Sequence, residues 1–240
     1  MDKPMDTVLF PLRVQELLLQ NPDLESFLAP LAVLLTERLR EWNVAGSSLM
    51  IVRSRRQPVQ VGSEPGFTEL QRGAHTEDPS RRVLAHQAPA VTRNLDGEDQ
   101  RSGYWTAACA LGMAAAAAVP VAVPDPDLAV LTCYSSSSGA FGPAALAAVE
   151  SAAAELATPL ALALRLDAQM HRARNLQAAL ESRTVVDLAA GIIMAQNNCG
   201  QQSAVEILRS VSNSRNVKVR DVAAGVVAVV SDRVSTHFEE

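Results

Sequence analysis

Lysine is nearly absent from this chain: only Lys3 and Lys218 occur among its 240 residues. No Gly-x-x-x-x-Gly-Lys sequence exists, so a P-loop for nucleotide phosphates is excluded. Because arginine supplies almost all of the positive charge, anion contacts are expected to use its planar, bidentate guanidinium group.

Cysteine and histidine are also scarce, and neither occurs in a pattern that binds metal. The cysteines form no CxxC pair and the histidines lack metal-ligand spacing. These residues are Cys109, Cys133, Cys199, His75, His86, His171 and His237. Scattered cysteines in an odd number indicate reduced thiols in a cytoplasm rather than a disulfide framework. We therefore expect a cytoplasmic protein without a metal site.

No run of apolar residues is long enough to cross a bilayer. The alanine- and valine-rich run Ala114–Val123 has ten residues and contains Pro120, whereas a spanning helix needs about 20. The acidic stretch from Met1 to Asp6 lacks the basic-then-apolar pattern of a signal peptide. We therefore expect no membrane association.

The net charge of −5 is unevenly distributed along the chain. Residues 1–167 contain 13 basic and 19 acidic residues, whereas residues 168–240 contain eight basic and seven acidic ones. Within Ser203–Arg220 four residues are basic and one is acidic. A local basic patch on an acidic protein favours a small anionic target over non-specific coating of nucleic acid.

The first two thirds of the sequence contain both helical and strand patterns. Apolar residues recur at spacings of three and four over residues 7–42, and Asn21-Pro22-Asp23 is a helix start. Strands are predicted at Gly46–Arg53, Gln57–Val61, Ala90–Thr92, Ala114–Val123 and Leu128–Tyr134. Helices are predicted at Asp78–His86, Gln100–Leu111 and from Pro143 onward. With a hairpin turn at Pro124-Asp125-Pro126, this order predicts an α+β domain with an antiparallel sheet.

The order of these elements also resembles that of a GAF domain, over roughly residues 20–165. The resemblance includes Gly112-Met113, then Val119-Pro120-Val121, and Ala140-Phe141-Gly142 before the final helix. It implies a fold that binds small molecules and dimerises, and it names no ligand. No cofactor is therefore predicted beyond an unidentified small molecule.

Tyr104 and Trp105 lie where the pockets of GAF domains are often walled, and the resemblance makes them candidate pocket residues. A role in the core alone is the favoured interpretation. The alanine run Ala114–Ala118 is unusual for a strand, because alanine is a poor strand former. It permits either close packing of a helix or space for a ligand.

A repeat of apolar residues follows Pro159, which either kinks or restarts the helix. Its members, at spacings of 4, 3, 3 and 4, are Leu166, Met170, Ala173, Leu176 and Leu180. This period is typical of a coiled coil or of a helix-packing stripe. We interpret residues 166–179 as a dimer stalk; packing on the chain's own sensory domain is the alternative.

Three short helical patterns occupy the C-terminal part of the chain. The first continues the stalk to about Asn197–Gly200, the second spans about Gln201 to Ser212, and the third follows Asn216, a suitable N-cap. The second is expected to bury Ala204, Ile207, Leu208 and Val211, and the third Val219, Val222, Ala223, Val226, Val227 and Val230. Ala189 and Gly191 are small where helices would cross closely. A bundle that serves only for dimerisation is the alternative interpretation.

Polar side chains gather near the junction of the second and third patterns. The candidate set is Arg183, Arg209, Ser212, Asn213, Arg215, Asn216, Lys218 and Arg220, of which the last six lie within nine residues. Amides and cations beside the free N–H groups of a helix N-terminus can bind phosphates and base edges. A solvated surface is the alternative.

Three motifs in order carry a second resemblance, over about 50 residues. The first helix has Ser182-Arg183, Val186-Asp187 and Ala189-x-Gly191-x-x-Met194; the second has Ala204-x-x-x-Leu208-Arg209-x-x-Ser212; the third has Asn216-Val-Lys218-x-x-Asp221-x-Ala223. In this spacing they closely resemble an ANTAR domain, the three-helix RNA-binding module of transcription antiterminators. The sequence departs from the family at Ala190, where many members have a lysine before the glycine. A phosphate contact made by that lysine would be missing here.

The two resemblances together imply a homodimeric transcription antiterminator. The expected domains are a GAF-like sensory domain at 1–165, the stalk at 166–179 and an ANTAR domain at 180–240. The family implies recognition of paired stem-loops in nascent RNA, so RNA polymerase is affected only indirectly through its transcript. No lysine between residues 4 and 217 could take the lysine role of a receiver domain. No catalytic residue set is visible, and we expect no enzymatic activity.

Two other functions are compatible with the sequence. The second and third helical patterns could form a helix-turn-helix that binds DNA, although the third is Val/Ala-rich beyond Asp221 and offers few side chains to a groove. A ligand sensor that acts by protein–protein contact through the C-terminal bundle is the other alternative.

Overall fold

The computed structural model describes residues 5–21, 23–54, 56–73, 78–92 and 103–235. Its internal contacts divide the chain into an N-terminal unit, residues 1–167, and a C-terminal unit, residues 168–240. One helix belongs to both units, and each unit is described by itself.

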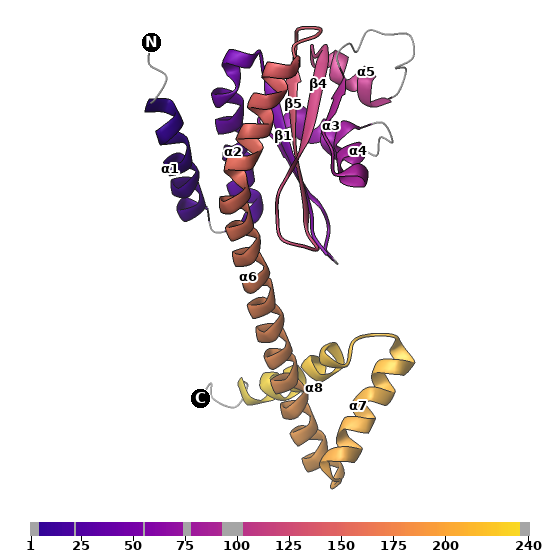
Figure 1. Ribbon diagram of the computed structural model, residues 1–240. Helices are drawn as coiled ribbons and strands as arrows, with labels where there is room; N and C mark the ends of the chain where they lie inside the picture. Colours follow the sequence, from indigo (N-terminus) through magenta and orange to yellow (C-terminus); the bar gives the residue numbers. More distant parts are fainter. Residues whose placement is uncertain (1–4, 22, 55, 74–77, 93–102, 236–240) are drawn as a thin grey trace. The chain divides into compact units, whose positions relative to one another are not determined.

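An antiparallel sheet forms the centre of the N-terminal unit (Figure 1). Its strands are β1 (Gly46–Val52), β2 (Val59–Gly62), β3 (Ala90–Thr92), β4 (Ala115–Val121) and β5 (Leu128–Ser135), in the spatial order β2-β1-β5-β4-β3. In the register, Leu131 of the central strand β5 lies between Leu49 of β1 and Val119 of β4. The predicted α+β class and the predicted β4–β5 hairpin are confirmed.

Helices cover both faces of this sheet (Figure 1). On one side lie α1 (Met5–Gln20), α2 (Leu24–Arg38) and the first part of α6 (Pro143–Asn197), with the short 3₁₀ helix η1 (Arg40–Trp42) after α2. On the other lie α3 (Pro65–Arg72), α4 (Pro79–His86) and α5 (Gly103–Ala110). The sequence patterns did not predict α3. Gln100, where α5 was expected to begin, lies outside the described residues.

The alanine run in β4 contributes to the packing of both faces. Ala115 and Ala117 belong to the core beneath α2 and α6, whereas Ala116 packs in the cluster that contains Tyr104. All of these residues are buried. Because alternate strand residues point to opposite faces, the small side chains leave room for bulky partners on both. Close packing is therefore the outcome at this strand.

Hydrogen-bonded polar groups lie buried beneath α3, α4 and α5. The Tyr134 hydroxyl is 3.1 Å from the hydroxyls of Ser48 and Tyr104, and it accepts a bond of 3.0 Å from Nε2 of Gln71. All of these side chains are buried. Pairing of this kind offsets the cost of removing polar groups from water.

We expect the two tyrosines of the chain to ionise only above their ordinary pKa of about 10. Burial raises the pKa of Tyr134 to about 12 and also raises the pKa of Tyr104. These pKa values are higher in the folded than in the unfolded chain, so the two neutral tyrosines stabilise the folded protein. This contribution is fully present below about pH 10 and is lost as the pH rises through the folded-state pKa values. When the pH rises from below the unfolded-state pKa of Tyr134 to above its folded-state pKa, the free energy of unfolding should fall by about 2–3 kcal/mol from this residue alone.

Ultraviolet absorbance of tyrosinate, measured beside urea unfolding at increasing pH, checks this expectation. No other tyrosine is present, so the absorbance reports only Tyr104 and Tyr134. Ionisation of both at about pH 10 in a protein that is still folded would contradict the buried arrangement.

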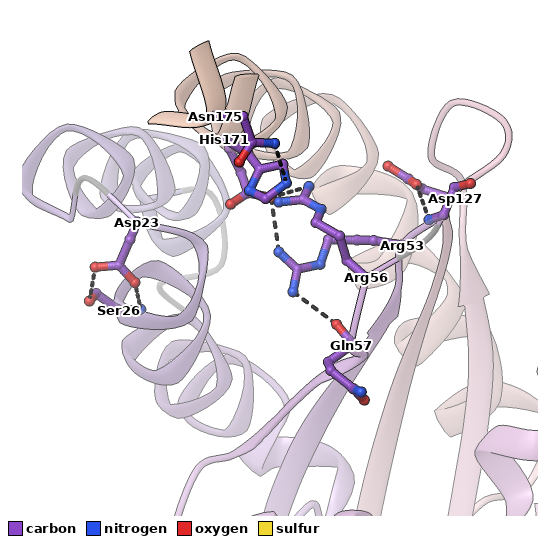
Figure 2. A network of polar contacts seen from close by, with 10 residues as sticks. Asp23, Ser26, Arg53, Arg56, Gln57, Asp127, His171 and Asn175 are labelled. Atoms are coloured by element: carbon purple, nitrogen blue, oxygen red, sulfur yellow. Dashed lines mark hydrogen bonds and ion pairs between the residues drawn. The ribbon is translucent and has the colours of Figure 1, made fainter. Parts of the chain in front are cut away.

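Two arginines after β1 hold a carboxylate of α6 (Figure 2). Arg53 donates to Oδ2 of Asp167 at 3.0 Å, and Arg56 donates to the same oxygen at 2.5 Å. In the same turn, the N–H of Ser54 donates to Oδ1 of Asp127 at 3.2 Å. Asp167 is the last residue of the N-terminal unit, so these bonds anchor α6 at the end of that unit.

The helix α6 runs without interruption from Pro143 to Asn197. Pro159 lies inside it, so the helix does not restart there. By length and composition α6 is apolar enough to cross a membrane, since an 18-residue window within it has a mean hydropathy of 1.3. One helix of this kind is weak evidence for a membrane span, because the core helix of a soluble protein passes the same test. Leu156 and Leu160 on this helix are fully buried in the core of the N-terminal unit.

The C-terminal unit is a bundle of the second part of α6 with α7 (Gln201–Arg215) and α8 (Val219–Ser235). Its core consists of small and medium apolar side chains from all three helices. The buried members are Ala189, Ala190, Ile193, Ala204, Leu208 and Ala223. This agrees with three helical patterns in the sequence, although α7 continues three residues beyond the predicted Ser212.

Candidate nucleic-acid interface

A tight corner joins α7 to α8 in the C-terminal unit. Asn216 caps α7 with a left-handed backbone (φ 52°, ψ 42°), and its N–H donates to the carbonyl oxygens of Ser212 and Asn213. The hydroxyl of Ser212 donates to the carbonyl of Val217 at 2.6 Å, and the N–H of Val217 donates back to the carbonyl of Ser212 at 3.1 Å. These bonds fix the direction in which the chain leaves α7.

The structure corrects the expected role of Asn216, which is the C-cap of α7 and not the N-cap of the third helix. Asparagine tolerates the left-handed region better than most residues. Lys218 immediately precedes α8, and its carbonyl accepts the N–H groups of Asp221 and Val222. Asp221 lies in the first turn of α8, where its negative charge complements the helix dipole.

The corner presents a group of exposed cations and amides. Six of the eight predicted RNA-binding residues are exposed on it or on the adjoining helices: Arg209, Asn213, Arg215, Asn216, Lys218 and Arg220. Ser212 differs from them, since its side chain is 7% exposed and its hydroxyl is already bonded. Arg183 lies apart on α6 and is exposed.

Few carboxylates neutralise these cations. Arg220 pairs with its neighbour Asp221 at 3.3 Å, and Arg183 pairs with Asp187 at 3.8 Å. Both pairs are largely exposed, so each contributes little to stability and exchanges readily with another anion. Within the described part of the chain, Arg209, Arg215 and Lys218 have no ion-pair partner. The corner therefore has cationic groups available for an external anion.

The cations do not all lie on one side of α7. Arg209 and Asn213 are four residues apart and share one side of the helix. Arg215 lies instead in line with Ile207 and Val211, eight and four residues before it, and all three line a groove. A ligand that contacted both sides would have to wrap around the end of α7.

The groove has a volume of about 630 Å³ and lies among α6, α7 and α8. Its walls are mainly apolar, from Ile193, Ile207, Val211, Val217, Val222 and Val226, and its polar lining residues are Gln196, Arg215 and Asp221. Its size is that of a ligand site. Ile207 is 40% exposed here, so the expectation that it is buried was wrong. The apolar period shows which side of a helix avoids water, but not whether another element covers that side.

The residues expected to support the bundle have mixed outcomes. Ala189, Ala204, Leu208 and Ala223 are buried, and Met194 packs against them while half-buried. Gly191 does not lie at a close crossing: it is exposed, and a Cβ built there would meet no atom within 4 Å. Its expected packing role was wrong because it faces away from α7 and α8.

Ala190, where the sequence departs from many family members, is almost fully buried in the bundle core. A lysine at this position would have to extend out of the core to bring its ammonium group to water or phosphate. Alanine fills the site without that requirement.

The two candidate pocket residues of the N-terminal unit are both packed in its core. Tyr104 is fully buried and Trp105 is 6% exposed, and their rings meet edge to face at 4.7 Å between centroids. Phe67 and Tyr134 stack in the same cluster, with ring centroids 4.9 Å apart. These rings fill the space around Tyr104 with protein side chains.

Comparisons with known proteins identify a domain family in the C-terminal unit. The profile of the ANTAR domain family matches residues 174–227. Solved structures similar to this chain include the N-acylhomoserine lactone dependent LuxR family transcription factor CepR2 from Burkholderia cenocepacia, with 16% identity over 66% of this chain and 98% of that one, at a TM-score of 0.47. A GAF domain region from Geobacter sulfurreducens PCA is 16% identical over 64% and 99% of the two chains, with a TM-score of 0.46.

A third similar structure is the GAF domain from the Acinetobacter phosphoenolpyruvate-protein phosphotransferase. It is 14% identical over 66% of this chain and 95% of that one, with a TM-score of 0.46. No curated protein sequence matches the chain.

The family match assigns a regulatory domain to the C-terminal unit. Residues 174–227 are an ANTAR domain, and an α+β unit with an antiparallel sheet precedes it in the chain.

Proposed function

We propose that this protein is a transcription antiterminator that binds paired stem-loops in nascent RNA under the control of its GAF-like domain. The observation that carries the proposal is the exposed cationic corner between α7 and α8, within the segment that matches the ANTAR family. RNA polymerase is affected only through its transcript, and the protein acts in the cytoplasm.

The chemistry of the corner suits hairpin loops better than uniform duplexes. A-form stems hide their base edges in a deep, narrow groove, whereas loops splay their bases within reach of arginine and asparagine. Arg209 and Asn213 supply hydrogen-bond donors on one side of α7. On the other side, Arg215 and Asp221 lie at an apolar groove, where a splayed base can stack and be held at its edges.

Ser212 has a supporting role in this proposal. Because its hydroxyl is bonded to Val217 and its side chain is nearly buried, it sets the geometry of the corner rather than contacting RNA. Arg209, Asn213, Arg215, Lys218 and Arg220 are the residues that we propose contact the RNA, with Arg183 on α6 as a further cation.

We also propose that the protein is a homodimer whose two ANTAR domains each bind one hairpin of the pair. Leu166, Leu176 and Leu180 on α6 are 42%, 63% and 55% exposed in the single chain. Large apolar side chains repeated along an exposed helix favour a helical partner. Linking two sites raises the effective concentration at the second hairpin. Domain boundaries at residues 165/166 and 179/180 are part of this proposal.

We expect the full-length protein to bind a paired-hairpin RNA more tightly than duplex DNA of equal length. The physical reason is that only the RNA offers unstacked loop bases beside phosphates. Fluorescence anisotropy at about 150 mM salt, with a single-hairpin RNA as the matched control, measures the difference. Equal affinity for the RNA and the DNA would contradict the proposal.

A further inference from the structure

The middle of α6 is an unusually exposed segment of helix. Every residue from 171 to 181 is exposed in the single chain, although apolar Leu176 and Leu180 are among them. A helix with no covered side receives no stabilisation from packing in the monomer. We call this segment, residues 171–181, the bare stalk. Its surface is free to contact another molecule.

From His171 to Leu180 the bare stalk carries positive charge and no carboxylate. His171, Arg172 and Arg174 lie near its start, and the sequence has no acidic residue between Asp167 and Glu181. Asp167 is itself occupied by Arg53 and Arg56. Neither Arg172 nor Arg174 forms an ion pair with any residue that the structure describes.

An ordinary solvated helix surface would show both signs of charge. The same helix does so directly afterwards, where Glu181 precedes Arg183 and Arg183 pairs with Asp187. The absence of carboxylates from residues 168–180 is thus a local property of the sequence. A surface whose charges all have one sign attracts a ligand of the opposite charge, because its charged groups are not already paired within the protein.

The arginines lie on different sides of the helix from the apolar repeat. With 3.6 residues per turn, Arg172 and Arg174 each lie roughly 100° from the centre of that repeat, in opposite directions. A dimer seam along Leu176 and Leu180 would leave both guanidinium groups in solvent. Covering the seam and binding an anion are therefore compatible.

The spacing along α6 also connects the bare stalk to the ANTAR domain. Arg172 and Arg183 are eleven residues apart, so they lie on the same side of α6, about 16 Å from each other along its axis. An extended polyanion can contact both at once, whereas a single small anion cannot. The spaced phosphates of a nucleic-acid backbone meet this requirement.

We propose that Arg172 and Arg174 bind phosphates in the stem of the RNA whose loop is bound at the α7–α8 corner. This inference rests on the proposed function. It adds a second contact surface, which recognises the length of the stem and not the sequence of the loop. Arginine suits this role, since its fork of donors matches phosphate oxygens.

The test replaces both arginines, R172A/R174A, in the full-length protein and measures RNA affinity against salt. Each lost phosphate contact lowers the slope of log affinity against log salt by about one unit, so the slope should fall by about two per protomer. Affinity for a long-stem hairpin should fall at least about tenfold at about 150 mM salt. A hairpin with the same loop and a shortened stem should bind both proteins equally, and loop-sequence preference should be unchanged.

The matched control is R81A/R82A, which removes two exposed arginines from α4 in the other unit; its salt slope should equal that of the unmodified protein. An unchanged slope in R172A/R174A would overturn the inference while leaving RNA binding intact. If the unmodified protein bound no RNA, the proposed function itself would fail. Loss of the dimer in R172A/R174A by light scattering, or loss of binding to anionic lipid vesicles with an unchanged RNA slope, would also overturn it.

Discussion

RNA binding is expected to fall at least about 1,000-fold when alanine replaces four exposed residues of the corner together, Arg209, Asn213, Arg215 and Lys218. Each side chain that reads a base contributes on the order of 1–3 kcal/mol, by analogy with base readout in DNA. Each phosphate-binding cation contributes about one unit of salt slope. Electrophoretic mobility shift or anisotropy titrations at several salt concentrations separate the two effects.

The fold should survive these four substitutions, because all four side chains are exposed and three of them have no ion-pair partner within the described residues. Circular dichroism of the variant verifies that α7 and α8 are intact. The matched control replaces Gln201 and Gln202, which are exposed at the start of the same helix. If the folded fourfold variant bound RNA as tightly as the unmodified protein, the interface would lie on another face.

Leu176→Glu is expected to convert the dimer largely to monomer. A charge placed in an apolar seam loses its hydration without gaining a partner, and in a homodimer two such charges would approach each other. A cost of about 3 kcal/mol raises the dimer dissociation constant roughly 100-fold. Light scattering over a range of protein concentrations measures this change.

The same substitution should affect the two RNA ligands differently. Paired-hairpin RNA should lose the advantage of two linked binding sites, whereas a single hairpin should bind the Leu176→Glu and Ala178→Glu variants equally, because both add one negative charge beside Arg172 and Arg174. Ala178→Glu is the matched control: it adds the same charge to an exposed position on the same helix, two residues away and far around it from the apolar repeat. An intact dimer with unaltered paired-hairpin affinity would place the dimer contact elsewhere, such as on α1 or α2.

Local signals in the sequence predicted much of the N-terminal unit. The strand Ala90–Thr92 has the predicted bounds, and α4 begins after Asp78, whose carboxylate accepts the N–H of Ser80 at 2.8 Å. Caps and alternating patterns depend on residues close together in sequence. The helix α3 was missed because it has eight residues, of which only Phe67 and Leu70 are large, buried hydrophobics.

The candidate interface was predictable in its composition but not in its geometry. The exposed cations of the corner could be identified from charge and from family motifs. The groove beside Arg215 could not, because a valine that lines an open surface follows the same helical period as a buried one. The hydrogen bond of the Ser212 hydroxyl was equally unpredictable, since a serine in a polar stretch has the pattern of a residue that contacts a ligand.

Asn216 is a position where restricted variation among related sequences could be mistaken for a contact with RNA. Its side chain is exposed, yet its left-handed backbone admits few residues other than glycine, asparagine and aspartate without strain. Restricted variation at this position would therefore report the shape of the main chain, even if its amide never touched RNA. Glycine is the replacement that removes the amide and keeps the backbone relaxed. Selection on the turn and selection on the ligand are thus separable at a single residue.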